Sequence, residues 1–109
     1  MHQRYLAHAI VHNNQVWRTS SVTITGDDAV SIERFSGETP ATIFISGIVC
    51  VCAEHRMNDT HRRALSRIVA SARLVETAIR YARKYMQENN LFLNSSDFDA
   101  KPLLLLLKR

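Results

Sequence analysis

The feature that most limits the fold is an almost unbroken apolar segment, ATIFISGIVCVC, at residues 41–52. A strand with one face in water alternates apolar and polar residues, whereas a strand covered on both faces is apolar throughout. The segment is too short, and too polar at Ser46, to span a bilayer. It therefore predicts a strand that is buried on both faces, and Gly47 within it indicates a β-bulge.

The residues before this segment predict three more strands joined by short turns. The candidates alternate in polarity or are rich in β-branched residues, and they cover RYLAHAIVH (4–12), VWRTSSVTIT (16–25) and AVSIERF (29–35). Asn13 and Asn14 both tolerate positive φ, which a two-residue type I′ hairpin requires. With residues 41–52 as the fourth strand, we expect an antiparallel β-meander over residues 1–54.

The apolar period changes after this meander and predicts one long helix over residues 57–90, with Asn58, Asp59 or Thr60 as its N-cap. On such a helix one broad apolar face holds Leu65, Ile68, Val69, Ala72, Val75, Ile79, Ala82 and Met86. A second apolar face, about a third of a turn away, holds Leu74, Ala78, Tyr81 and Tyr85. Because only one face can cover the sheet, the second needs another partner.

The tail, residues 91–109, contains five consecutive leucines, Leu103–Leu107. Pro102 argues against a helix running through the tail, so we expect a strand or a short helix. A run of leucines has no polar side in either conformation, so it is buried within the chain or between chains. Together with the second helix face it predicts an oligomer interface at Leu74, Ala78, Tyr81, Tyr85, Leu103, Leu105 and Leu107.

These segments combine into a single α+β domain of 109 residues, with a meander, one helix and an apolar tail. No secretory signal or membrane-spanning run is recognisable, so no membrane partner is expected. Two cysteines without a secretory signal favour a cytoplasmic location.

Cys50 and Cys52 raise the question of a thiol or metal site. On one strand face their Cβ atoms lie roughly 6.5 to 7 Å apart, too far for a disulfide and awkward for a shared zinc ion. We therefore predict buried, reduced cysteines and no metal or other cofactor. The alternative is a small metal or thiol site made by Cys50, Cys52 and His55, if the strand end bends.

Basic residues are concentrated in the second half of the chain, which has eleven Lys and Arg against five Asp and Glu. On a continuous helix four of them fall within about 40°: Arg62, Arg73, Arg80 and Lys84. The simple interpretation is a solvated face on which Glu76 pairs with Arg73 and Arg80. The alternative is a phosphate-tracking stripe of a nucleic-acid-binding accessory protein, although no recognised nucleic-acid motif accompanies it.

No nucleophile motif or spaced set of acidic ligands supports an enzyme. The sequence instead favours a non-enzymatic interaction or assembly protein that acts as a homo-oligomer, a dimer or higher. The two surplus apolar surfaces, on the helix and in the leucine tail, are the basis of this prediction.

Overall fold

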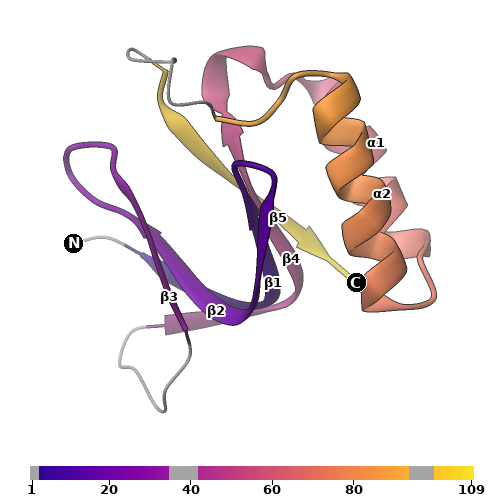
Figure 1. Ribbon diagram of the computed structural model, residues 1–109, viewed down its shortest axis with the longest axis horizontal. Coiled ribbons are helices and arrows are strands. Elements are labelled where there is room, and N and C mark those ends of the chain that lie inside the picture. The colour runs from indigo at the N-terminus through magenta and orange to yellow at the C-terminus, as the bar shows by residue number, and fades with distance from the viewer. Residues whose placement is uncertain (1–2, 35–41, 94–99) are drawn as a thin grey trace.

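The computed structural model describes residues 3–34, 42–93 and 100–109, which form one curved sheet with two helices on one of its faces (Figure 1). The elements, in chain order, are β1 (Arg4–His12), β2 (Gln15–Ile24), β3 (Val30–Arg34), β4 (Thr42–Ala53), the short 3-10 helix η1 (Glu54–Arg56), α1 (Asp59–Ser71), α2 (Val75–Glu88) and β5 (Pro102–Lys108). The predicted α+β class is confirmed. No helix in the described ranges is long and apolar enough to cross a membrane.

The sheet is mixed, with strand order β3-β2-β1-β4-β5, so the prediction of a four-stranded antiparallel meander is wrong at β4. Strands β1, β2 and β3 do form a meander, but β4 pairs with β1 in parallel and β5 pairs with β4 antiparallel. The reason lies in the apolar character of β4. A fourth meander strand would sit at the sheet edge, whereas β4 gains a neighbour on each side.

The leucine tail forms β5, so of the two conformations left open by the sequence the strand is the one adopted. Its side chains alternate between the two faces of the sheet. Leu105 and Leu107 are buried on the helix side, while Leu104 and Leu106 pack on the opposite side. A continuous leucine run suits this position because β5 has apolar clusters on both faces.

The single helix over residues 57–90 is also wrong, because α1 ends at Ser71 and α2 begins at Val75. Ala72 and Leu74 between them are extended. Each of the two shorter helices turns its own apolar face to the sheet and buries Leu65 and Val69 on α1, and Ala78, Ile79, Ala82 and Met86 on α2. Helix α1 packs over β5 and α2 over β1, side by side (Figure 1). Of the three candidate caps, Asn58 is the one used, since its side chain accepts a hydrogen bond from the His61 N–H at 2.8 Å.

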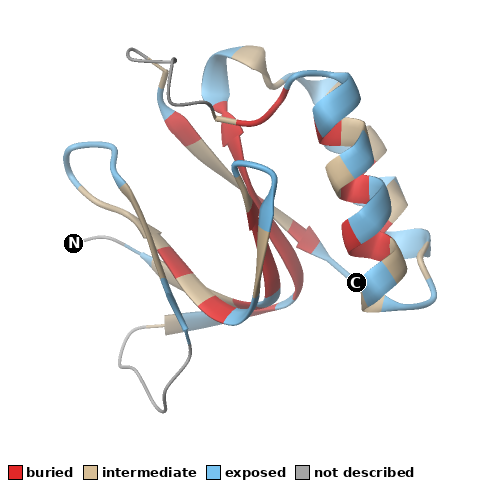
Figure 2. Cartoon of the chain, in the orientation of Figure 1, coloured by how far each residue is buried: buried red, intermediate tan, exposed pale blue. Residues whose placement is uncertain are grey.

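The core is divided by the sheet into two clusters (Figure 2). The helix-side cluster contains Ile48, Cys50 and Cys52 of β4 together with Leu65, Val69, Ile79 and Met86 of the helices. The cluster on the other face contains Ile10, Val22, Val49 and Val51, with Trp17 packed against it. The second half of β4 is therefore buried on both faces as predicted, but Ile43 and Phe44 near its start are exposed.

The sheet bends where the pairing of β1 with β4 changes register. Ala7 pairs with Ile45, but Ala9 pairs with Ile48, so β4 has one extra residue at this point. This confirms the bulge predicted at Gly47. A Cβ atom on Gly47 would overlap the carbonyl oxygen of Leu107 and lie 3.0 Å from its carbonyl carbon. Glycine is thus required for β5 to approach β4 here.

The β1–β2 hairpin follows the sequence prediction closely. Asn13 and Asn14 have φ values of 51° and 62°, both positive as in a type I′ turn. The Arg83 guanidinium on α2 donates a hydrogen bond of 2.9 Å to the Asn14 carbonyl oxygen. This contact ties the hairpin turn to the helical layer.

Candidate functional site

The two cysteines lie in the helix-side core and are free and fully buried. Burial raises the pKa of the Cys52 thiol to about 12 and that of the Cys50 thiol well above its ordinary value. His55 lies beyond the strand in η1, is exposed, and contacts Arg56. Among the described residues no group of three His, Cys, Asp or Glu side chains is placed to hold a metal ion. The arrangement supports a structural role for both sulfurs.

We expect both thiols to be unreactive in the folded protein. A thiolate is the reacting species, and burial disfavours it, so labelling with a disulfide reagent at pH 8 should be at least about 100-fold slower than in denaturant. Ser46→Cys, at an exposed position of the same strand, is the positive control and should label at once. Rapid labelling of either native cysteine without unfolding would contradict the prediction.

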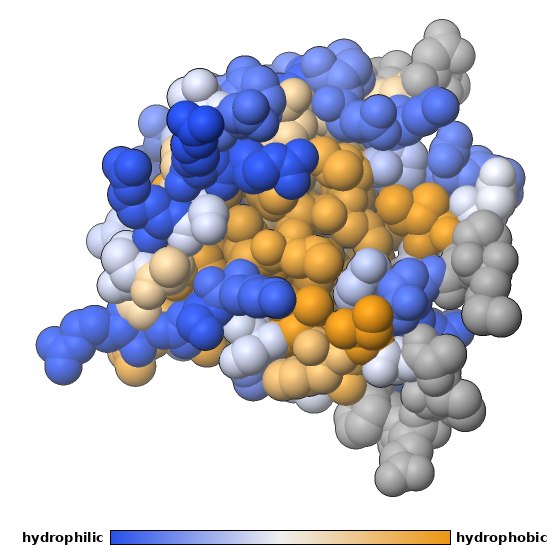
Figure 3. All heavy atoms as spheres, turned by 180° about the vertical axis from the view of Figure 1, so that it is seen from behind, coloured by the Kyte–Doolittle hydropathy of each residue, from blue (hydrophilic) through white to orange (hydrophobic). Residues whose placement is uncertain are grey.

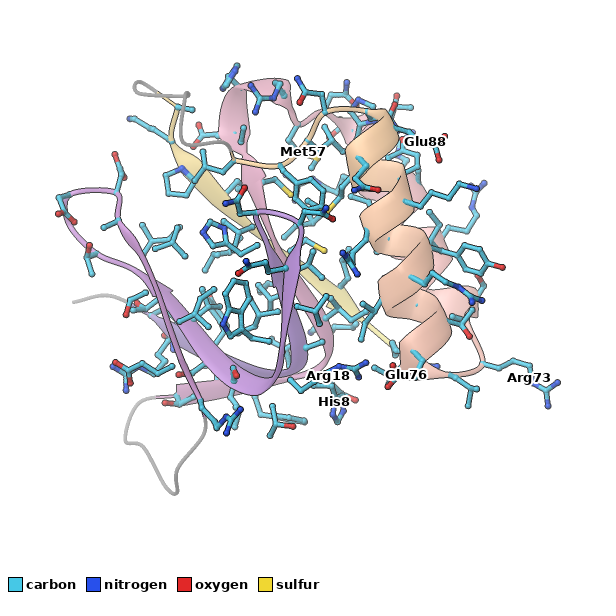
Figure 4. The ribbon with its side chains drawn as sticks, in the orientation of Figure 1. His8, Arg18, Met57, Arg73, Glu76 and Glu88 are labelled. Atoms are coloured by element: carbon cyan, nitrogen blue, oxygen red, sulfur yellow. The ribbon has the colours of Figure 1, made fainter. Side chains whose placement is uncertain are left out.

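The break between the helices distributes the predicted basic stripe over α1, α2 and the connection between them. Arg62 lies on α1, Arg73 in the connection, and Arg80 and Lys84 on α2; all four are exposed. Glu76 does not pair with Arg73 or Arg80. Its carboxylate accepts two hydrogen bonds from the Arg18 guanidinium of β2, which lowers the pKa of Glu76. Figure 4 shows Arg18 and Glu76 together and Arg73 pointing away from both.

Because these cations do not form one line, we expect only weak, salt-sensitive binding to nucleic acid. Four contacts of this kind neutralise about four phosphates, which gives little affinity at physiological salt. Fluorescence anisotropy with short DNA and RNA duplexes at several salt concentrations measures this. Submicromolar binding near 150 mM salt that is lost in the double variant Arg73→Glu, Arg80→Glu would contradict the expectation and favour the nucleic-acid alternative.

The predicted second face of the helix lies on α2, with Leu74 at its N-cap. Leu74 and Tyr81 are 64% and 48% exposed, whereas Ala78 is buried. The Tyr85 hydroxyl is within hydrogen-bonding distance, 2.8 Å, of His61 Nδ1 on α1. Leu74 and Tyr81 line a pocket of about 670 Å³ at the corner of the hairpin, with Ile68, Ser71, Ala72, Arg73 and Thr77. This surface is called the helix corner below.

The leucines of β5 form the second candidate surface. Leu105 and Leu107 are buried in their own chain, while Leu103, Leu104 and Leu106 are partly exposed. In Figure 1, β5 and α1 lie behind β1 and α2, so the view from behind looks onto β5. Figure 3 shows a hydrophobic area at the centre of this face, bordered on the helical side by hydrophilic side chains.

The backbone of β5 presents an open edge. The Arg109 N–H donates to the Ser46 carbonyl, and the Glu54 N–H donates to the Lys101 carbonyl, at 2.8 and 2.9 Å. In an antiparallel pair alternate residues point their N–H and C=O groups at the partner strand. Residues 101, 103, 105, 107 and 109 therefore face β4, while Pro102, Leu104, Leu106 and Lys108 face outward. No strand in the described ranges pairs with this outward edge.

The two edges of the sheet differ in how they are protected. Edge strands are normally short, charged or interrupted, because an open edge pairs with other strands. At the far edge, β3 has five residues and carries Glu33 and Arg34. On β5, by contrast, only the terminal Pro102 and Lys108 protect the edge, and five leucines lie between them. The β5 edge is thus the less protected of the two.

Comparison with known proteins adds no relative: no family model, curated protein or solved structure matches this chain.

Proposed function

We propose that this chain is a non-enzymatic interaction protein that acts as a homo-oligomer. The observation that carries the proposal is the five-leucine strand on the open edge of the sheet. An open edge offers unpaired backbone donors and acceptors, and leucine side chains add apolar area on both sides of it. Both properties favour association with another strand.

The exposed helix corner gives further support for an interaction role. Leu74 and Tyr81 are large, exposed and adjacent to a pocket, which is typical of contact surfaces between proteins. The two buried free cysteines fit a reducing compartment such as the cytoplasm.

Sedimentation velocity over a concentration range of about 1 to 300 µM tests the proposal, because modest interfaces associate in the micromolar range. We expect a concentration-dependent rise from the monomer mass of 12.4 kDa toward a closed oligomer. A protein that stays monomeric across this range would contradict the homo-oligomer proposal.

A further inference from the structure

We infer that the partner of the open β5 edge is β5 of a second copy, paired antiparallel about a two-fold axis at Leu105, so that two sheets join into one. This inference rests on the proposed homo-oligomer and assigns it a surface and a geometry. It predicts a closed dimer, because a two-fold pairing uses the β5 edge of both chains and leaves no β5 edge free for a third chain.

The register follows from which backbone groups face outward. With Leu105 opposite its own copy, Leu104 of each chain lies opposite Leu106 of the other. The backbone N–H and C=O groups of both residues point away from β4 and toward the second copy. Each of these pairs exchanges two N–H···O bonds, as hydrogen-bonded antiparallel pairs do. At each end, Lys108 faces Pro102, whose carbonyl accepts the Lys108 N–H. Every outward N–H of β5 thereby gains an acceptor, and the missing N–H of proline leaves only one carbonyl per end unpaired.

The charges on the strand favour this antiparallel pairing over a parallel one. Lys108 is the charged residue of β5, and Lys101 and Arg109 flank the strand. A parallel, in-register pair would bring each Lys108 beside its copy, and like charges directly opposite are destabilising. In the antiparallel pair the two Lys108 residues lie at opposite ends, about 20 Å apart at normal strand rise.

The side-chain pattern is also complementary to itself. The sequence PLLLLLK is symmetric about Leu105 in its five leucines, so reversing one copy places leucine opposite leucine at each of these positions. On the helix face Leu103 would meet Leu107 of the other chain, and on the opposite face Leu104 would meet Leu106. A second copy is therefore a partner that matches this edge along its whole length.

The decisive variant is Leu106→Pro compared with Leu106→Ala. Both substitutions remove the partly exposed leucine side chain, but only proline also removes the outward-pointing N–H. Neither substitution removes the hydrogen bonds that residues 103, 105 and 107 make to β4. Two hydrogen bonds are lost per dimer, so Leu106→Pro should raise the dimer Kd at least about tenfold above that of Leu106→Ala.

Amide hydrogen exchange of the wild type, resolved by residue, gives an independent test that needs no variant. At a total chain concentration about 100 times the dimer Kd, roughly 7% of the chains remain monomeric, so the outward amides of Leu104, Leu106 and Lys108 should exchange about 15-fold more slowly than in the dilute monomer. The inward amides of Leu103, Leu105 and Leu107 are protected by β4 in both states and serve as the internal control.

The outcomes separate the inference from the proposed function. A dimer whose Kd is the same in Leu106→Pro and Leu106→Ala, or whose outward amides stay unprotected, would overturn the β5 pairing but leave self-association intact. Loss of that dimer in Leu74→Glu would then assign it to the helix corner. If Leu106→Pro does not fold, the exchange pattern of the wild type decides. An open-ended polymer in place of a dimer would also overturn the inference, and a strict monomer would overturn both.

Discussion

Gly47→Ala is expected to lower the free energy of unfolding by about 3 kcal/mol, a large effect for the addition of one methyl group. The new Cβ atom would overlap the backbone of Leu107, and a backbone atom cannot move aside as a flexible side chain can. Strand β5 would have to shift away from β4 at the bulge, which disturbs the pairing of Ile48 with Leu107 and the packing of both.

Urea denaturation followed by circular dichroism measures this change. Ser46→Ala is the matched control, because Ser46 is the exposed neighbour within the same bulge and uses its backbone carbonyl to bind Arg109. Its free energy of unfolding should stay within about 0.5 kcal/mol of the wild type. A Gly47→Ala protein as stable as Ser46→Ala would show that β5 is not held against β4 as described.

Leu105→Asp is expected to unfold the chain, not to release a folded monomer. Leu105 is 3% exposed and packs in the helix-side core opposite Cys50. The substitution removes a buried leucine and places a carboxylate there without a cationic partner, a cost of about 5 kcal/mol that rivals the whole stability of a small domain.

Far-ultraviolet circular dichroism at 25 °C should show the loss of native structure in Leu105→Asp. Lys108→Asp on the same strand is the control, because its side chain is exposed and the fold should survive. A folded Leu105→Asp protein with native helix content would mean that β5 is dispensable to the core. Strand β5 contributes both to the core and to the proposed dimer interface. Only positions whose backbone groups point away from β4, such as Leu106, can therefore test the interface without unfolding the core.

Local patterns of the sequence predict the strands well and their neighbours poorly. The alternation of residues 4–12 and the Asn13-Asn14 turn specify β1 and its hairpin, because both signals act over a few residues. Whether β4 pairs with β3 or with β1 is decided by long-range packing, and the connection between β3 and β4 carries no signal for it. The apolar character of β4 did contain a clue, since continuous apolar runs are typical of parallel strands that are covered on both faces.

The apolar period gives only a weak signal of the helix break: the broad face runs across it from Leu65 to Met86, while the second face begins only after it, at Leu74. Ser71 lends weak local support, since its hydroxyl donates to the Arg67 carbonyl at 2.7 Å and so competes with helical bonding. Once the helix breaks, Arg62, Arg73, Arg80 and Lys84 no longer share one line, and Glu76 reaches Arg18. The candidate surfaces thus depend on tertiary structure that periodicity alone does not predict.

The placement of β4 between β1 and β5 also has a consequence for folding kinetics. Cys50 pairs with Val11 on one side and with Leu105 on the other, so its neighbours are 39 and 55 positions away in sequence. Closing such distant pairs is slow, and we expect refolding in the range of milliseconds to seconds even though the β1–β2 hairpin and both helices are local. Until β5 docks, β4 and the leucine run both expose strand-forming apolar surface. The yield of native protein should therefore fall when refolding is carried out at higher protein concentration, and it should be highest when refolding is carried out at low concentration.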